Sequence, residues 1–264
     1  MIRTDLPLMR LKNKTLLPIV QGGMGVGVSA SQLAGSVARE GAVGTIASID
    51  LRRRHPDLMA AAGAPAPVVR INWSSSFYYP LDYRQGNTCI ATTVEEAVEA
   101  GAEAVICSLF LEDGDERRET DNVRTFSEVV RQKERLGIPL IGECYVVEHK
   151  ELGPERMHAK VKRVTRVMAE LGADLIKCFF TGERFHEVVA NVPVPVFTIG
   201  AEKLSTDVAV LEKAAASVRQ GARGIIFGRN IFMAANPPKI IQALNDVMNS
   251  GEAPKDAAKR HGLK

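Results

Sequence analysis

One pattern recurs along the chain and constrains its fold more than any other feature. A helix-like stretch ends in a glycine or a helix-breaking pair, and a run of apolar, often β-branched residues follows at once. Glycine supplies the left-handed residue at a helix end, and continuous apolar runs are typical of strands buried on both faces. This alternation predicts a parallel sheet with crossover helices. The eight expected strands lie in LLPIVQGG, EGAVGTIAS, APVVRINW, AGAEAVICS, LGIPLIGECY, LGADLIKCFF, VPVPVFTIG and QGARGIIFGRN.

Eight strand–helix units in 264 residues predict an α/β fold, a closed (β/α)8 TIM barrel, with an open doubly wound sheet as the structural alternative. No linker or composition shift divides the chain, so residues 1–264 are predicted to form one domain. The longest irregular stretch begins at Ser74, after the third strand. In a barrel this stretch would lie at the C-terminal rim, where active sites are built.

Composition excludes several classes of function. Lys and Arg exceed Asp and Glu by 34 − 31 = 3 charges, and no long basic run occurs, so neither a nucleic-acid partner nor a membrane surface is expected. No apolar stretch is long enough to span a bilayer, and the N-terminus does not resemble a signal peptide. The four cysteines have no Cys-x-x-Cys spacing, which favours reduced thiols in a cytoplasmic enzyme. They are Cys89, Cys107, Cys144 and Cys178.

Lys177 stands inside the apolar run at the end of the sixth expected strand, ADLIKCFFTG. Burial disfavours an ammonium group and lowers the pKa of a lysine, which frees the amine to attack a carbonyl carbon. A lysine at a strand end can also extend its charged head to solvent. Position alone leaves both interpretations open.

The fifth expected strand ends in GECYVVEHK, where Tyr145, together with Glu143 or Glu148, is a candidate for moving protons beside an amine nucleophile. Strand alternation puts Glu143 and Tyr145 on one face and Cys144 on the other. The alternative is that Tyr145 only fills a layer of the barrel core.

Glycine-rich turns follow the seventh and eighth expected strands, in FTIGAEKLST and IIFGRNIF. In barrels, such turns bind phosphate through backbone N–H groups. Gly200 and Gly228 are the residues expected against the phosphate, with charge from Lys203 or Arg229. The alternative is a pair of ordinary turns.

Motifs for dinucleotide binding and for metal binding have little support in the sequence. The glycines of QGGMGVGVS do not have the Gly-x-Gly-x-x-Gly spacing of a dinucleotide-binding turn, and no acid follows at the expected distance. The five histidines show no metal-ligand spacing, so no metal site is predicted.

From about Leu51 onward, the chain resembles the archaeal-type class I fructose-bisphosphate aldolases, a family grouped with deoxyribose-phosphate aldolase. The matching phrases are RINWSSSFYYPLDYRQ, TTVEEAVEAGAEAVICSLF, ERLGIPLIGECY, MAELGADLIKCFFTG and GARGIIFGRNIF. The resemblance implies a Schiff base at Lys177 and proton transfer by Tyr145. It implies phosphate binding at Gly200, Ala201, Lys203, Gly228 and Arg229. It also implies a phosphorylated ketose such as fructose 1,6-bisphosphate as substrate, no cofactor, and a homo-oligomer.

Residues 1–50 instead resemble the opening of nitronate monooxygenases, FMN-dependent barrels in which a Gln-Gly-Gly-Met turn lies against the flavin. That turn corresponds here to Gln21, Gly22, Gly23 and Met24, so Gln21, Gly22 and Met24 are possible contacts at the rim of the first strand. Aldolases of the first family carry an Asp-His-Gly phrase at this place. The sequence therefore suggests a composite of residues 1–50 and residues 51–264. Two alternatives to the aldolase remain: an FMN oxidoreductase, or a barrel with little activity.

Overall fold

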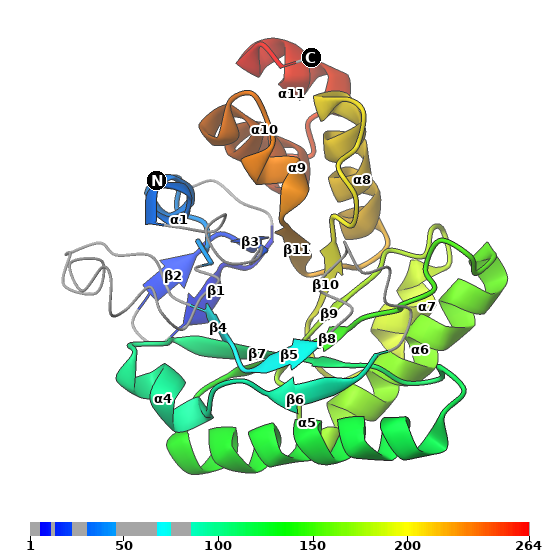
Figure 1. Cartoon of the computed structure of the whole chain (residues 1–264). Helices are drawn as coiled ribbons and strands as arrows, with labels where there is room; N and C mark the ends of the chain where they lie inside the picture. Colours follow the sequence, from blue (N-terminus) through cyan, green and yellow to red (C-terminus); the bar gives the residue numbers. More distant parts are fainter. Residues whose placement is uncertain (1–5, 12–13, 23–30, 46–67, 75–85, 264) are drawn as a thin grey trace. The chain divides into compact units, whose positions relative to one another are not determined.

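The computed structural model describes residues 6–11, 14–22, 31–45, 68–74 and 86–263, apart from the side chains of residues 31–34 (Figure 1). Two compact units are present. The central unit comprises Val68–Val196, and the terminal unit comprises Met1–Pro67 together with Phe197–Lys264. Each unit is described by itself.

Parallel strands form the core of the central unit. Their order is β4-β7-β8-β9, and neighbouring strands run in the same direction. Their bounds are Val68–Arg70 for β4, Ala104–Leu109 for β7, Leu140–Cys144 for β8 and Leu175–Cys178 for β9. All residues of β7 and β8 are buried, as expected for strands covered on both faces.

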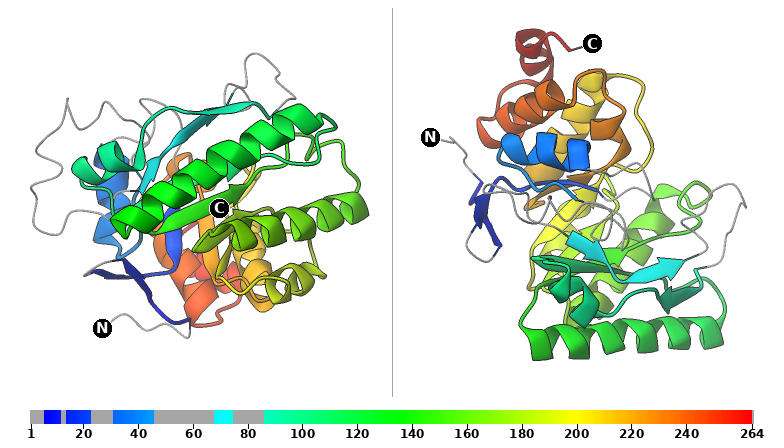
Figure 2. Two further views of the ribbon diagram at one scale, coloured as in Figure 1. Left: turned by 90° about the horizontal axis from the view of Figure 1, so that it is seen from below. Right: turned by 60° about the vertical axis from the view of Figure 1, so that its left-hand side comes forward.

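Helices follow these strands and cover them. Figure 2 shows the two longest, α5 and α6, side by side. Helix α5 starts nine residues before the expected Thr125, because the Asp115 side chain caps it by accepting from Arg118 N–H. Gly137 and Gly172 end α5 and α6 at φ of 63° and 113°, as the glycine pattern predicts. The bounds are Val94–Glu99 for α4, Glu116–Leu136 for α5, Pro154–Leu171 for α6 and Phe185–Ala190 for α7.

Lys133 of α5 is a buried cation at the N-terminal ends of β8 and β9. Its Nζ donates to Asp174 Oδ1 at 2.9 Å and Oδ2 at 3.0 Å. Asp174 Oδ2 also accepts from Leu140 N–H at 2.7 Å. The carboxylate therefore connects α5, the start of β8 and the residue before β9.

We expect Asp174→Ala to lower the free energy of unfolding by about 2 kcal/mol, because the backbone N–H of Leu140 loses its acceptor and the Lys133 ammonium keeps only Glu134, at 2.7 Å, as a carboxylate partner. Urea unfolding measures this change. Asp174→Asn is the matched control: it keeps an acceptor oxygen for Leu140 N–H and should lose less. Equal stability of Asp174→Ala and the wild type would show that this contact contributes nothing.

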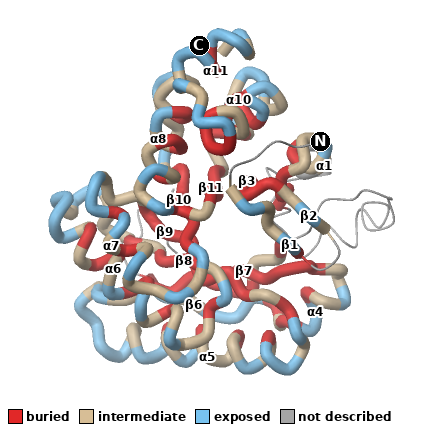
Figure 3. Tube along the Cα trace, turned by 180° about the vertical axis from the view of Figure 1, so that it is seen from behind, coloured by how far each residue is buried: buried red, intermediate tan, exposed pale blue. Residues whose placement is uncertain are grey.

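The terminal unit also has a parallel arrangement, in the order β3-β11-β10. The strands are β3 (Ile19–Gln21), β11 (Gly224–Phe227) and β10 (Val196–Ile199). The first residue of β10, Val196, belongs to the central unit, and its other three residues belong to the terminal unit. Their residues are buried (red in Figure 3). The helices are α1 (Ser31–Arg39), α8 (Asp207–Arg219), α9 (Arg229–Phe232), α10 (Pro237–Asn249) and α11 (Pro254–His261).

The expected strands are present within the described residues with two differences. The second, in EGAVGTIAS, is reduced to one parallel bridge between Val20 and Val43, and residues 46–67 lie outside the described part. The third, APVVRINW, is divided: β4 ends at Arg70, and β5 (Asn72–Ser74) pairs antiparallel with β6 (Thr88–Ile90). Asn72 lies just after the division, where its amide donates to Thr88 Oγ1 at 2.7 Å and to the Ser108 carbonyl at 2.8 Å.

One hairpin was not expected from the sequence. It pairs β1 (Met9–Leu11) with β2 (Lys14–Leu16). The charged residues between the apolar positions of the N-terminal stretch obscured the hairpin.

Candidate active site

Lys177 lies on β9 with 7% of its surface exposed. Its Nζ donates a short hydrogen bond to Glu143 Oε1 on β8. Burial lowers the pKa of the Lys177 ammonium; the Glu143 carboxylate opposes this lowering, and the nearby Arg70 guanidinium adds to it. The side chain is a buried amine in an ion pair and does not extend into solvent.

Glu143 accepts from three side chains on three different strands. Oε1 accepts from Lys177, and Oε2 accepts from Arg70 Nη2 at 2.7 Å and from the Ser108 hydroxyl. Burial alone would raise the pKa of Glu143, but the two cations and the hydrogen bonds hold it well below its usual range. Glu143 is therefore a carboxylate whose negative charge is shared between Arg70 and Lys177.

Strand register brings these side chains together. Ser108 of β7 is paired with Glu143 of β8, and Glu143 is paired with Lys177 of β9. Paired residues on neighbouring strands point to the same face, so the three side chains form one row. Arg70 reaches this row from the end of β4, and its Nη1 donates to Ser108 Oγ at 2.6 Å. We name Arg70, Ser108, Glu143 and Lys177 the charged row.

Sequence analysis missed Arg70 and Ser108. Each is a polar residue inside an apolar run, in APVVRINW and AVICSLF respectively. The same signal singled out Lys177. Applied to every strand, it would have found both residues.

Tyr145 follows β8 directly and belongs to an aromatic cluster. Its ring centroid lies 5.7 Å from that of Phe110, 5.9 Å from that of Phe179 and 6.3 Å from that of His149. Phe179 is two residues beyond Lys177, and the His149 ring stacks on it at 5.0 Å. Tyr145 is therefore held in the loop after β8, beside the loop after β9.

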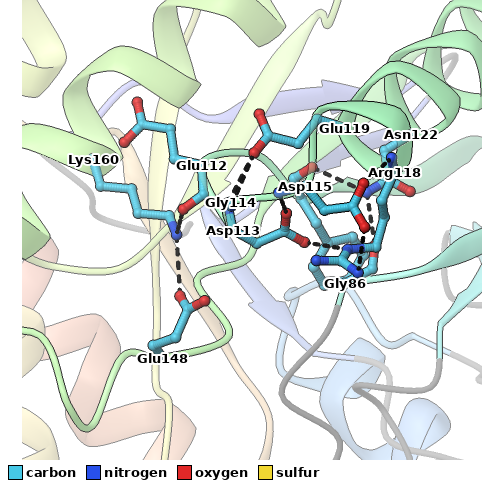
Figure 4. Close-up of polar contacts among 11 residues, drawn as sticks. Gly86, Glu112, Asp113, Gly114, Asp115, Arg118, Glu119, Asn122, Glu148 and Lys160 are labelled. Atoms are coloured by element: carbon cyan, nitrogen blue, oxygen red, sulfur yellow. Dashed lines mark hydrogen bonds and ion pairs between the residues drawn. The ribbon is translucent and has the colours of Figure 1, made fainter.

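A second set of polar contacts holds the loops after β7 and β8 (Figure 4). The buried Lys160 of α6 donates to the Glu112 carbonyl at 2.9 Å and to Glu148 Oε2 at 3.1 Å. Glu112 has a φ of 60°, the left-handed region that favours glycine, and its carboxylate binds Arg163. Glu148, a candidate proton carrier by sequence, is thus an anchor for the loop that carries Tyr145.

The sequence-predicted phosphate residues lie in the terminal unit, at the turns after β10 and β11. Asn230 is fully buried and connects the two turns. Its Nδ2 donates to the Gly200 carbonyl at 3.2 Å and to the Glu202 carbonyl at 3.0 Å. Its Oδ1 accepts from Leu204 N–H at 2.8 Å. A Cβ on Gly200 would lie 2.9 Å from Asn230 Nδ2, so glycine is required there.

Ala201 has a φ of 55°, an uncommon value for alanine. All described peptide bonds are trans, so the C=O of one residue and the N–H of the next point in opposite directions. Because the Gly200 and Glu202 carbonyls face Asn230, the N–H groups of Ala201 and Lys203 point away from it. Neighbouring N–H groups that point one way form a concavity suited to an anion.

The turn after β11 begins at Gly228, and Arg229 opens the four-residue helix α9. Gly22 N–H donates to the Phe227 carbonyl at 2.8 Å, and a Cβ on Gly22 would lie 3.3 Å from Gly228 N. Gly22, the residue directly after β3, therefore lies against the start of the turn after β11. We name the residues Gly200, Ala201, Lys203, Gly228 and Arg229 the phosphate turns, after the role that the sequence predicts for them.

Gln21 ends β3 with its side chain fully buried. Its Oε1 accepts from Thr45 N–H at 3.1 Å, and its Nε2 makes a short contact with the Gly22 carbonyl. Met24 lies outside the described residues. Contact between a ligand and Gln21, Gly22 or Met24 stays a prediction.

Within the described ranges, no group of three or more His, Cys, Asp or Glu side chains is arranged to hold a metal ion. No described helix is both long and apolar enough to cross a membrane.

Comparison with known proteins assigns the family. The sequence profile of the DeoC/LacD family aldolases matches residues 31–234. The chain belongs to the DeoC/LacD aldolase family. A relative in Saccharolobus solfataricus, an uncharacterized aldolase, is 30% identical over 200 residues, which cover 73% of this chain and 74% of the relative. The 3-hydroxy-5-phosphonooxypentane-2,4-dione thiolase of an Enterobacter species is 29% identical over 171 residues, 65% of this chain and 55% of the thiolase.

Among solved structures, an archaeal fructose 1,6-bisphosphate aldolase superposes with a TM-score of 0.69 at 21% identity, covering 89% of this chain and 94% of that one. This likeness, with the family assignment, confirms the predicted α/β fold of TIM-barrel type and the prediction of a lyase. The family match begins at residue 31, twenty residues before the expected boundary near Leu51. That the chain forms a single domain, as a composite of residues 1–50 and 51–264, stays a prediction.

Proposed function

We propose that this DeoC/LacD family aldolase forms an imine between Lys177 and the ketone carbon of a phosphorylated ketose. The buried ion pair between Lys177 and Glu143 carries the proposal. A buried amine with a lowered pKa supplies more of the neutral nucleophile near pH 7, and the hydrogen bond to Glu143 holds that amine in place. Attack produces a carbinolamine, and loss of water leaves an iminium ion.

The iminium ion then withdraws electrons from the neighbouring carbon–carbon bond. In cleavage, a base takes the proton of the hydroxyl group on the departing carbon, the bond breaks, and its electron pair forms an enamine on Lys177 while an aldehyde leaves. We propose Tyr145 as the group that moves this proton, since it belongs to the aromatic cluster beside the loop after β9. Protonation of the enamine and hydrolysis of the imine free the amine again.

The phosphate turns supply the second half of the proposal. Outward-pointing N–H groups of Ala201 and Lys203, with the charges of Lys203 and Arg229, suit a phosphate dianion. Binding at a phosphate far from the reacting carbons orients the ketone toward the amine.

We propose fructose 1,6-bisphosphate as the first substrate to test, because the fold matches aldolases that act on it. The thiolase relative is named for a phosphorylated diketone. Both substrates combine a ketone with a phosphate, and this combination defines the class of molecule to be screened.

The resemblances suggest further proposals that need their own measurements. Self-association is expected and is checked by light scattering. No cofactor is expected, and a visible flavin absorbance in the purified protein would favour the FMN alternative. Gln21, the residue that the FMN alternative would place against the flavin, accepts a hydrogen bond from Thr45 N–H.

Borohydride trapping tests the function. A reduced imine with dihydroxyacetone phosphate or fructose 1,6-bisphosphate should add the mass of the ligand less one oxygen atom to Lys177 alone, because imine formation releases water and reduction adds two hydrogen atoms. Trypsin does not cleave after a modified lysine, so the adduct should appear in the peptide of residues 167–184, VMAELGADLIKCFFTGER. Lys203 and Lys213 serve as internal controls for nonspecific reaction. Absence of an adduct at Lys177 with every phosphorylated ketone tried would reject the imine mechanism.

A further inference from the structure

Lys213 is a half-buried lysine on α8 that the mechanism above does not use. Its Nζ donates to the Gly200 carbonyl at 3.0 Å. Burial lowers the pKa of Lys213 to about 8, and no nearby charge contributes to this shift. Among the described residues, no carboxylate forms an ion pair with it. An ammonium in this position is costly unless an anion compensates for it.

The surroundings of Lys213 are polar but uncharged. Thr198 on β10 donates to Ser217 Oγ at 2.9 Å, and Ser217 donates to the Lys213 carbonyl at 2.9 Å. These contacts hold α8 against β10. Lys213 therefore extends from a fixed helix to the end of the strand.

The Gly200 carbonyl accepts from both Lys213 Nζ and Asn230 Nδ2. Because the peptide is trans, the N–H of Ala201 points away from both donors. Lys213 thus lies behind the Gly200–Ala201 peptide, while the proposed anion would lie in front of it. A cation on the carbonyl oxygen polarises the amide and strengthens donation by its N–H.

We propose that Lys213 is a positioning residue for phosphate: it supplies a half-buried positive charge behind the Gly200–Ala201 peptide and strengthens anion binding without touching the anion. This inference rests on the proposed function, since it assumes that the phosphate turns bind phosphate. It adds the prediction that part of the affinity for phosphate comes from Lys213, which lies outside the phosphate turns.

Three variants separate the charge from the hydrogen bond. Lys213→Met removes both, Lys213→Gln keeps a donor without charge, and Lys213→Arg keeps both. Titration calorimetry with inorganic phosphate should show roughly tenfold weaker binding to Lys213→Met and to Lys213→Gln than to the wild type. This is the loss of affinity expected when one charge is removed from the far side of a peptide at a partly buried site. The Arg variant should remain close to the wild type.

A second measurement excludes a merely structural effect. Borohydride trapping of dihydroxyacetone, which has no phosphate, should be the same in the wild type and in Lys213→Met. Thermal unfolding of Lys213→Met should not occur at a lower temperature, because an apolar side chain replaces a half-buried ammonium that has no ion-pair partner among the described residues.

The outcomes distinguish this inference from the proposed function. Equal phosphate affinity of wild type and Lys213→Gln would overturn the role of the Lys213 charge, while imine trapping at Lys177 would still support the aldolase. Failure of the wild type to bind phosphate would overturn the phosphate turns and Lys213 together. Parallel loss of phosphate binding and of dihydroxyacetone trapping in Lys213→Met would show general damage and would also overturn the inference.

Discussion

Lys177→Met should lower kcat/KM by at least about 10⁴-fold and abolish borohydride trapping, because the covalent intermediate cannot form without the amine. Turnover of fructose 1,6-bisphosphate, or of the phosphorylated ketone that gives the strongest adduct, is the measurement. The fold should persist, since Glu143 keeps two partners, Arg70 and Ser108, and the new side chain is apolar and of similar length.

The matched control is Lys203→Met, which removes a lysine from the phosphate turns and leaves the charged row intact. It should raise KM more than it lowers kcat, because it weakens binding away from the reacting carbons. A Lys177→Met variant with activity within tenfold of the wild type would show that the reaction does not proceed through this lysine.

Glu143→Gln should lower the free energy of unfolding by about 3 kcal/mol, because it leaves Arg70 and Lys177 close together without the carboxylate that compensates both charges. Glu143 is 4% exposed, so solvent screens little of this repulsion. Chemical denaturation measures the loss. Glu155→Gln is the matched control: its side chain is 83% exposed and pairs with Arg184, so it should cost less than about 1 kcal/mol.

The same variant should change the pH dependence of trapping. The Glu143 carboxylate raises the pKa of Lys177 against the effect of burial. Removing the Glu143 carboxylate lowers the pKa of Lys177, so the neutral amine persists to lower pH. The pH below which imine formation falls off should therefore be lower in Glu143→Gln than in the wild type. Movement toward higher pH would contradict the assigned direction, and equal stability of Glu143→Gln and Glu155→Gln would contradict the energetic role of the charged row.

Local patterns in the sequence determined much of the fold. A glycine after a helix and a continuous apolar run depend on backbone conformation and on burial within a few residues, so they predicted β7, β8, β9 and β11 and the helix ends at Gly137 and Gly172. The same reasoning singled out Lys177, because a charge inside an apolar run is costly wherever the run folds.

Tertiary structure alone decided which partners Lys177 has. Arg70, Ser108 and Glu143 meet it through the register of strands that are distant in sequence, and a shift of one residue would turn a side chain to the opposite face. The place of Lys213 behind the Gly200 peptide likewise depends on how α8 packs against β10. Residue types and spacing identified the groups able to do chemistry, but their pairing arises from long-range packing that no local pattern contains.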